Sequence, residues 1–368
     1  MATTNRTNRT NRTNRTNRTN RTDLDDELSG IGDGSSLGLS EALQSAMLAF
    51  KGKPFALTAE DLVGPDTQTY YRRLNARHRD HLITAALMQG LQVTEPAGSV
   101  AQNRVARLAA GPSALLRLGL DTRASAATLE FWKGQIDAMR SQKWNRDDRL
   151  GEIVVQQTDI LSFLGLCLPI AANTHPWVMV LLDAVQVVAF RVATEIKDIL
   201  RMPRPVALAP DLAPVIRTPS HGAFPSGHAT EAFAAAAVLG ALFPKRYGEL
   251  RRMAERIASN RGFAGVHFPV DHHGGAILGD ILGNHIVTRL FVGAQLRAPG
   301  PGGVYAEIGF GAGRPLPDAT LGTAVDDYAL RSPVLLAVPV RPTGAIASQG
   351  ILTWLAGRVL GDIGPTEA

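Results

Sequence analysis

Four strongly apolar stretches constrain the fold of this chain more than any other feature of its sequence. They span residues 161–172, 177–189, 232–243 and 274–293. A helix that crosses a bilayer needs about 20 nearly uninterrupted apolar residues. Two of the stretches are too short, and the other two are interrupted by polar side chains, namely Asp183, Gln186, Asp280, Asn284, His285 and Arg289. We therefore predict the buried helices of an all-α helical bundle, with no transmembrane insertion.

The composition supports a folded protein with a large core. Of the 368 residues, 45% are hydrophobic and 19% are charged, which excludes a wholly disordered or fibrous chain. The sequence pattern divides the chain into four segments. We expect a disordered repeat and linker at 1–37, an N-terminal layer of amphipathic helices at 38–150, a helical core at 151–295, and a turn-rich segment that packs on the core at 296–368.

Residues 5–22 are six tandem Asn-Arg-Thr units without a hydrophobic side chain. Such a tract cannot join a core, so we expect it to be disordered. Without its six arginines the net charge falls from +5 to −1, which leaves no electrostatic basis for binding nucleic acid. The first 30 residues lack the apolar run of a signal peptide, so we expect a cytoplasmic protein. Cys167 is the only cysteine, which excludes an intrachain disulfide.

The core segment predicts five long helices. Residues 151–201 form two of them, separated by a break at 173–176. The second should end near Met202, because Pro203 and Pro205 cannot continue it. After a proline-rich loop, three further helices are predicted at 228–243, 245–261 and 271–290. Beyond them, the apolar runs 304–310 and 334–340 predict strands or extended packing segments.

Two cations lie close together where the second helix should end. Lys197 and Arg204 are seven residues, or two helical turns, apart, so both project to one side if the helix continues to the proline stop. Two cations that converge beside an apolar bundle need an anion. The alternative is an ordinary basic helix terminus that complements the helix dipole.

The sequence Pro225-Ser226-Gly227-His228 opens the next predicted helix. Free backbone N–H groups at a helix start, a glycine that allows close approach and the Ser226 hydroxyl favour an anion site. His228 lies in the first turn, where it could exchange a proton with a bound group. Taken alone, the motif also fits an ordinary serine N-cap.

A third group consists of Arg261, His267 and Asp271. The arginine supplies a fixed fork of donors for oxyanion oxygens. His267 can be a nucleophile or a metal ligand if Asp271 holds its second ring nitrogen, although a structural histidine is the alternative. A zinc site that also uses His272 and His273 is the weaker interpretation, because adjacent helical side chains point about 100° apart.

The order of the three motifs resembles the signature of a known superfamily. Three motifs follow one another between about residues 195 and 275. The first is lysine, six residues and Arg-Pro, the second is Pro-Ser-Gly-His, and the third is arginine, five residues, histidine, three residues and aspartate. This is similar to the superfamily of type 2 phosphatidic acid phosphatases (PAP2), bacterial non-specific acid phosphatases and vanadium-dependent haloperoxidases. The apolar helices from 151 to 294 fit its helical core. Asn260 departs from the serine that the phosphatases usually carry there.

The resemblance implies a role for each motif residue. His267 would be the nucleophile that forms a phosphohistidine, or the only protein ligand of vanadium, and Asp271 would hold its ring. His228 would be the acid or base. Vanadate adopts the five-coordinate geometry that phosphoryl transfer visits near its transition state, so one site can serve both chemistries. The phosphate or vanadate oxygens would be held by Lys197, Arg204, Ser226, Gly227 and Arg261.

The surrounding residues favour the haloperoxidase branch by a narrow margin. His221 lies seven residues before His228, similar to the second histidine of the bromoperoxidases, and Ala229-Thr230 also resembles the peroxidases. Thr194 and the run 267–271 favour the phosphatases instead. We predict an enzyme that oxidises a halide with hydrogen peroxide on a bound vanadate and then modifies an organic acceptor. The alternative is a soluble acid phosphatase that hydrolyses phosphomonoesters at the same residues without a cofactor.

Both interpretations make the partners of the site small molecules, and a homo-oligomer is compatible with either. A third class is a catalytically silent oxyanion-binding protein on the same fold. The complete set of contact residues argues against it, because degenerate sites tend to lose charged members first.

Overall fold

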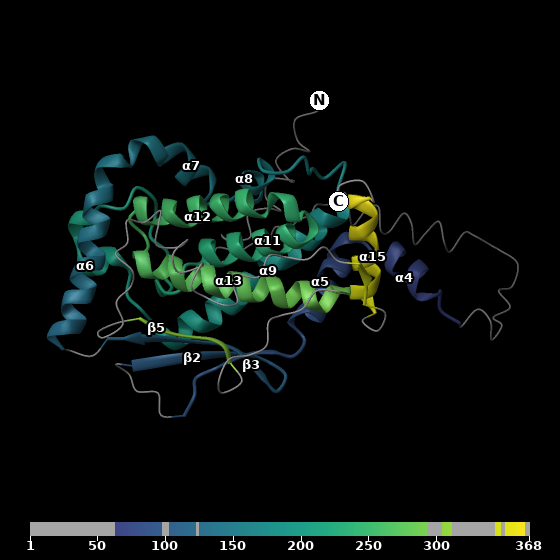
Figure 1. Ribbon diagram of the computed structural model, residues 1–368, viewed down its shortest axis with the longest axis horizontal. Coiled ribbons are helices and arrows are strands. Elements are labelled where there is room, and N and C mark those ends of the chain that lie inside the picture. The colour runs from purple at the N-terminus through teal and green to yellow at the C-terminus, as the bar shows by residue number, and fades with distance from the viewer. Residues whose placement is uncertain are drawn as a thin grey trace, which may run out of the picture.

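The computed structural model describes residues 63–97, 103–122, 125–292, 304–310, 343–346 and 350–364, and most of them are helical (Figure 1). The predicted all-α class is thereby confirmed. The segment 1–37 and the run 334–340 lie outside the described residues, so the interpretations of both stay predictions.

Four long helices build the centre of the molecule. They are α9 (Pro176–Leu200), α11 (Gly227–Leu242), α12 (Tyr247–Phe263) and α13 (Pro269–Leu290). Helix α11 lies in the middle and packs against the other three (Figure 1). Every α11 side chain from Ala229 to Leu242 is buried. The second helix of the core and the three that follow the proline-rich loop are thus confirmed to within a few residues.

Glycines bring α11 and α13 into near contact. Gly275, Gly279 and Gly283 recur every four residues along α13, on one face of the helix. A Cβ atom added at Gly279 would lie only 2.3 Å from the Thr230 carbonyl oxygen. A backbone hydrogen bond also joins the starts of the two helices, because the Ser226 N–H donates to the Asp271 carbonyl at 2.8 Å.

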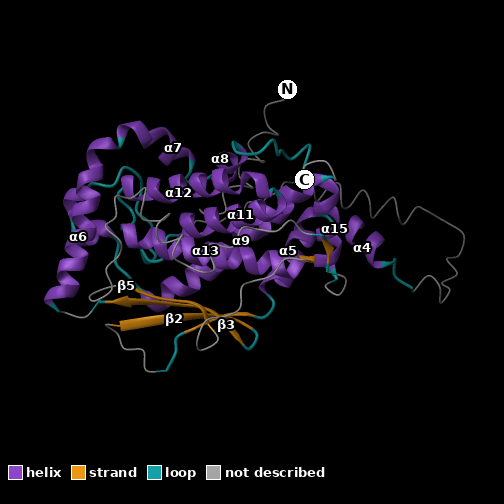
Figure 2. Ribbon diagram, in the orientation of Figure 1, coloured by secondary structure: helices purple, strands orange, loops and turns teal. Residues whose placement is uncertain are grey.

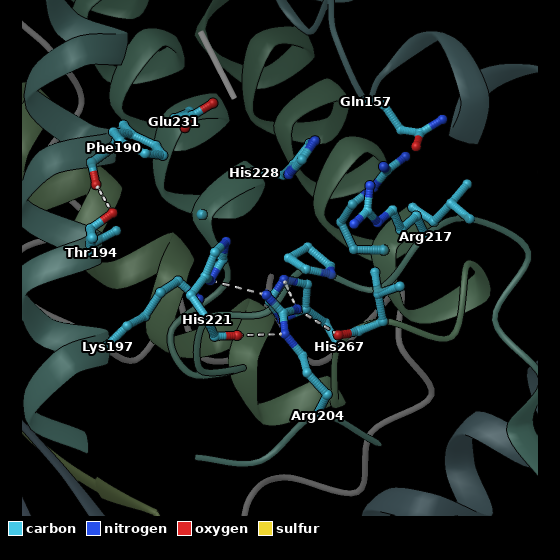
Figure 3. A pocket seen from close by; sticks show the side chains of 16 residues that line it. Gln157, Phe190, Thr194, Lys197, Arg204, Arg217, His221, His228, Glu231 and His267 are labelled. Atoms are coloured by element: carbon cyan, nitrogen blue, oxygen red, sulfur yellow. Dashed lines mark hydrogen bonds between the residues drawn. The ribbon is translucent and has the colours of Figure 1, made fainter. Parts of the chain in front are cut away.

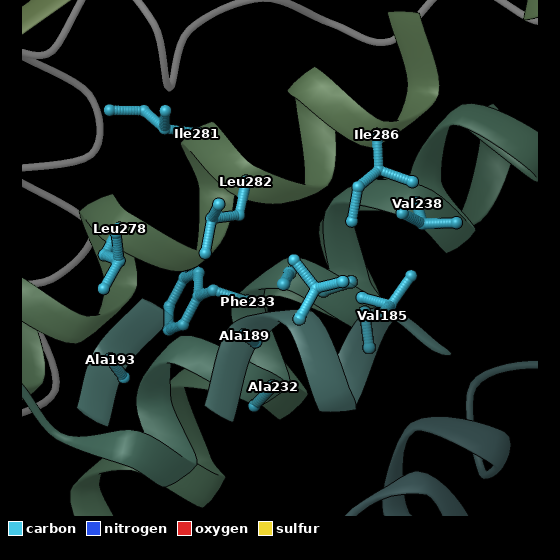
Figure 4. Packing of buried hydrophobic residues seen from close by; sticks show 14 of the residues in the cluster. Val185, Ala189, Ala193, Ala232, Phe233, Val238, Leu278, Ile281, Leu282 and Ile286 are labelled. Carbon is cyan, nitrogen blue, oxygen red and sulfur yellow. The ribbon is translucent and has the colours of Figure 1, made fainter. Parts of the chain in front are cut away.

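Small and large apolar side chains alternate across the rest of this interface. Phe233 of α11 lies near Leu278 and Leu282 of α13, and Ala189 and Ala232 lie where α9 meets α11 (Figure 4). Close-packed apolar side chains of this kind fix the distance between helices. The helix ends that carry the three motifs are therefore held by a rigid core.

Shorter elements cover the two ends of the bundle. Helix α6 extends along one end, whereas α4, α5 and α15 gather at the other end, where α5 and α15 pack against α9 and α4 packs against α15 (Figure 1). Among the described residues the helices outside the centre are α4 (Thr67–Arg73), α5 (Ala76–Met88), α6 (Ala126–Gln142), α7 (Leu150–Val155), α8 (Leu161–Gly165), α10 (Pro205–Leu208) and α15 (Ile351–Ile363). Single 3-10 turns span Lys143–Asn145, Asp147–Arg149, Pro210–Leu212 and Pro244–Arg246.

A four-stranded sheet runs along one side of the bundle, against α9 and α13 (Figure 2). Its order is β1-β2-β3-β5, with antiparallel pairing except between β3 and β5, which are parallel. A second, two-stranded sheet pairs β4 with β6. The strands are β1 (Leu91–Thr94), β2 (Asn103–Ala110), β3 (Ser113–Asp121), β4 (Phe291–Val292), β5 (Val304–Phe310) and β6 (Gly344–Ala345).

The sheet corrects the prediction of a wholly helical layer at 38–150. Residues 103–121 form a hairpin whose turn contains Gly111 at φ +58°, a conformation that favours glycine. Strand β3 is leucine-rich and buried on both faces, because Leu115, Leu116 and Leu118 are all covered. Because β3 does not alternate apolar and polar side chains, its sequence lacks the period of two by which a strand is recognised, and it was predicted to be helical.

Two other sequence predictions are wrong. Residues 151–172 form the short helices α7 and α8 instead of one long helix, and the Asp159 carboxylate starts α8 by accepting from the Ser162 N–H at 3.0 Å. The segment 296–368, predicted to be turn-rich, contains the 13-residue helix α15. Strand β5 agrees with the strand interpretation of 304–310.

One helix also qualifies as a membrane span by length and composition. Within the described residues this is the stretch Pro176–Leu208, with a mean hydropathy of 1.7. Of its most apolar 18-residue segment, 56% is buried inside the protein. The prediction that no stretch qualifies is wrong here, because the apolar residues around Asp183 and Gln186 outweigh these two side chains in the average.

Candidate active site

The three motifs meet at one cavity that opens to solvent (Figure 3). Its walls come from the end of α9, the start of α11, the end of α12 and the loop before α13. Ser226 and Asp271 are fully buried directly behind this wall. The predicted residues that line the cavity are Lys197, Arg204, His221, Gly227, His228, Arg261 and His267.

Lys197 and Arg204 reach the cavity from separate elements. Helix α9 ends at Leu200, and Arg201 follows in the left-handed region at φ 49°. The prediction that one continuous helix presents both cations is therefore wrong, although the turn still brings them together. The Lys197 Nζ donates to the carbonyls of Gly222 and Ala223 at 2.8 and 2.9 Å, which leaves its third proton available.

The Arg204 guanidinium is fixed by the backbone around it. It donates to the carbonyls of His221 at 3.0 Å and Val266 at 2.8 Å. Its Nη1 also lies 3.1 Å from the His267 Nε2. These bonds orient the guanidinium toward the position of a bound oxyanion, so the side chain needs little further ordering when the ligand binds.

Arg261 is almost completely buried yet incompletely bonded. Its Nη2 donates to the Ile153 carbonyl at 3.0 Å and lies 3.3 Å from the Gln156 Oε1. Its Nε and Nη1 have no hydrogen-bond partner among the described residues. Unsatisfied buried donors are costly, and a bound oxyanion would supply the missing acceptors.

His267 is held in one orientation by Asp271. The His267 Nδ1 lies 2.9 Å from the Asp271 Oδ2, which also accepts from the Phe268 N–H at 2.9 Å. A carboxylate only accepts, so Nδ1 carries the proton and the Nε2 lone pair faces the cavity cations. Burial, followed by the charges of Arg204 and Lys197, lowers the pKa of His267 well below its ordinary value. The ring is therefore kept neutral and nucleophilic.

His228 lies on the first turn of α11, at the centre of the cavity (Figure 3). Its Nε2 donates to the Gln156 carbonyl at 3.0 Å, which leaves Nδ1 free to exchange a proton. Burial and the charge of Arg261 lower the pKa of His228. A bound anion would raise this pKa again and favour the protonated ring.

The start of α11 combines a cap with an anion site. The Ser226 Oγ accepts from the Ala229 N–H at 3.4 Å, so Ser226 is the N-cap of the helix. A Cβ added at Gly227 would meet no atom within 4 Å, which leaves room for a ligand at this backbone. The N–H groups at the helix start can therefore face a bound anion.

Burial lowers the pKa values of Arg204 and Arg261 to about 10. It also lowers the pKa of Lys197, where Arg204 adds repulsion, and it raises the pKa of Asp271. Burial thus disfavours the charged form of each of these groups, and Asp271 is the one acid among the described residues whose charge acts on both Lys197 and Arg204 from within the site. A dianionic oxyanion would supply further counter-charge to the three cations.

Comparison with known families agrees with this geometry. Residues 175–292 match the model of the PAP2 superfamily. Residues 175–292 belong to the PAP2 superfamily. The chain is therefore an enzyme, and the matched region contains every predicted site residue.

Part of the chain is also similar to a solved structure, a transmembrane PAP2-type phosphatidylglycerolphosphate phosphatase from Bacillus subtilis. The two chains share 20% identity over 44% of this chain and 84% of that one, with a TM-score of 0.34. Comparison with curated proteins gave no match.

Two residues of this PAP2 site were missed by the sequence analysis. Gln156 connects His228 to Arg261, and the Asn260 amide fixes the Gln156 side chain by donating to its Oε1 at 2.9 Å. Glu231 lines the cavity one helical turn after His228. Glu231 could have been predicted from the sequence, because it lies three residues after the motif residue His228. Gln156 could not, because only tertiary packing places it beside the cavity.

The zinc interpretation receives no support from the part of the chain that the structure describes. No group of three or more histidine, cysteine or acidic side chains is arranged there to hold a metal ion. The His273 Nδ1 donates instead to the Pro269 carbonyl at 3.0 Å.

Proposed function

We propose that this PAP2 enzyme hydrolyses phosphomonoesters through a phosphohistidine on His267. The observation that carries the proposal is the Asp271–His267 pair, which leaves the His267 Nε2 unprotonated toward the Arg204 guanidinium and the cavity. This reverses the order of the two predicted activities. The superfamily match fits the phosphatase alternative.

The first chemical step would transfer the phosphoryl group to the protein. The His267 Nε2 lone pair forms a bond to phosphorus while the bond to the ester oxygen breaks. His228 gives its proton to the departing oxygen, so the alcohol leaves neutral. Asp271 stabilises the positive charge that develops on the His267 ring through the bond to Nδ1.

The second step would release phosphate. A water molecule attacks phosphorus, the bond to Nε2 breaks, and His228 takes the proton from the water. The charge on the phosphoryl oxygens would be stabilised in both steps by Lys197, Arg204 and Arg261, because oriented donors in a buried site need no reorganisation.

The decisive experiment measures p-nitrophenyl phosphate hydrolysis by the purified chain. We expect vanadate-sensitive turnover, loss of at least about 10⁴-fold in kcat for His267→Ala, and an acid-labile, base-stable phosphoprotein in rapidly quenched wild type. His78→Ala, which removes an exposed histidine of α5, is the matched control and should retain full activity. Unchanged turnover in the His267→Ala protein would refute the proposed nucleophile.

The position of His221 favours a second candidate function, the predicted vanadium-dependent haloperoxidase. His221 lines the cavity, and its Nδ1 lies 3.2 Å from the Arg204 Nη2. The unpartnered Arg261 donors and the unprotonated His267 Nε2 fit vanadate as well as phosphate. Bound vanadate would supply Lewis-acid activation of hydrogen peroxide. Vanadate-dependent bromination of monochlorodimedone would establish this function.

We also propose that α9 is a core helix of the bundle instead of a membrane span. It contacts α5, α11, α13, α15 and the sheet, and Gln186 and Lys197 are buried along it. Recovery of the active chain in the soluble fraction without detergent would support this proposal and the predicted cytoplasmic location. Activity confined to the membrane fraction after a carbonate wash would refute both.

A further inference from the structure

Glu231 has no role in the hydrolysis described above, although it lines the same cavity. It is the only acid among the described residues that form the walls. The other charged or titratable residues there are Lys197, Arg204, Arg217, His221, His228, Arg261 and His267. An ionised carboxylate would repel an anion in this cavity, and a protonated carboxyl adds no positive charge to hold one, so the presence of Glu231 requires a separate reason.

The carboxyl group of Glu231 is buried without a partner. The residue is only 2% exposed, and no hydrogen bond joins its side chain to any described residue. Burial raises its pKa to about 8, against the opposing charge of Lys197. Lys197 does not compensate fully, because its two hydrogen bonds go to backbone carbonyls. A ligand could supply the missing partner.

Glu231 lies on the side of the cavity away from the anion cage. It follows Gly227 by four residues on α11, about 6 Å along the helix axis. Phe190 and Thr194 line the same region from α9, and Figure 3 shows them near Glu231 and apart from Arg204 and His267. A phosphoryl group in the cage would therefore extend its alcohol portion past His228 toward these three side chains.

This region offers acceptors and an aromatic ring. The Thr194 hydroxyl donates its proton to the Phe190 carbonyl at 2.8 Å, so its oxygen is left to accept. An ammonium group suits such a wall, because carboxylates accept charge-assisted hydrogen bonds and aromatic rings attract cations. A neutral alkyl group would leave the Glu231 carboxyl unpaired.

We propose that Glu231 selects phosphomonoesters whose alcohol carries a protonated amino group about two carbons from the ester oxygen. The inference rests on the proposed phosphatase function and names its substrate class. Glu231 acts by recognition alone and takes part in no bond cleavage. Because the free carboxyl holds a proton near neutral pH, binding of the ammonium releases that proton to the solvent.

Binding of two phosphonates tests the inference without turnover. The ligands 3-aminopropylphosphonate and n-butylphosphonate have equal chain lengths, differ only by ammonium against methyl, and cannot be hydrolysed at an ester bond. By calorimetry at pH 7.5, we expect wild type to bind the amino ligand at least about tenfold more tightly. Glu231→Gln should reduce the ratio to about one. Glu195→Gln, the same change at the surface Glu195–Arg191 pair of α9, should preserve it.

Turnover gives a second readout. The ratio of kcat/KM for phosphoethanolamine over n-propyl phosphate should follow the ratio of phosphonate affinities in all three proteins. Equal affinity of wild type for the two phosphonates overturns the inference without any variant, and so does a ratio that survives in Glu231→Gln. Hydrolysis of p-nitrophenyl phosphate would then still support the phosphatase. Failure to bind either phosphonate, together with no hydrolysis, would overturn both proposals.

Discussion

Two arginines on the same helix, α12, one largely buried and one fully buried, have opposite surroundings. Arg251 pairs with the buried Asp280 carboxylate at 3.1 Å, and its guanidinium lies over the rings of Phe233 and Tyr247 at 5.4 and 5.5 Å. Arg261 is still more deeply buried, but it has no acidic partner among the described residues. One cation has its counter-charge inside the fold, and the other depends on an external one.

The difference separates stability from function. For a paired buried cation, removal of either partner destabilises the folded state, because it leaves an uncompensated charge. An unpaired cation that lines a cavity destabilises the empty protein and favours the complex with an anion. Burial without a counter-ion is thus the feature that distinguishes a binding arginine from a structural one, although both occur on one helix.

The largest expected effect is on the unpaired arginine. Arg261→Ala should lower kcat/KM for p-nitrophenyl phosphate by about 10²- to 10³-fold, because it removes donors to the developing charge. Its midpoint of urea unfolding should stay unchanged or rise, since an uncompensated buried charge is removed. Steady-state kinetics and urea unfolding followed by circular dichroism test the two halves. A large loss of stability with intact kcat/KM would assign Arg261 to the structure instead.

The second effect is on the paired arginine. Asp280→Ala should lower the free energy of unfolding by about 3 kcal/mol, because Arg251 is left buried without its carboxylate. The Tyr247 hydroxyl, which accepts from Arg251 at 3.0 Å, limits the loss. Well below its midpoint of thermal unfolding, the variant should retain wild-type kcat/KM. A loss of activity in the fully folded variant would contradict the separation of the two roles.

The sequence was sufficient to predict the central helices and the residues that meet at the cavity. Prolines and N-caps mark the ends of α9, α11 and α13, and the predicted residues lie at those ends. Local signals therefore fixed both the elements and the positions of Lys197, Ser226 and His267. The error at Arg204 arose because the helix ends before the proline, at a left-handed residue that sequence spacing does not reveal.

The remaining features depend on tertiary contacts. Strand β3 is apolar on both faces because helices and other segments cover it, so its leucines resemble a helix in the sequence. The Gln156 side chain and carbonyl reach Arg261 and His228 from a segment more than 70 residues away. Glu231 differs from an ordinary helix residue only in its burial beside a cavity, which the sequence does not encode locally.

The smallest expected effect is on a third arginine of α12, which sharpens the comparison. Arg256 is 43% exposed and binds the Glu152 carboxylate, with its Nε 2.8 Å from the Oε2. Solvent screens such a pair, so Arg256→Ala should lower the free energy of unfolding by less than about 1 kcal/mol. It should leave kcat/KM within about twofold, because Glu152 can keep its bond from the Asn260 amide at 2.9 Å. Urea unfolding and steady-state kinetics of Arg256→Ala test both values, and the same measurements on Arg261→Ala and Asp280→Ala give the effects with which they are compared. An activity loss comparable to that of Arg261→Ala would mean that the Glu152–Asn260–Gln156 chain transmits surface changes to His228, and that burial alone does not separate the three arginines.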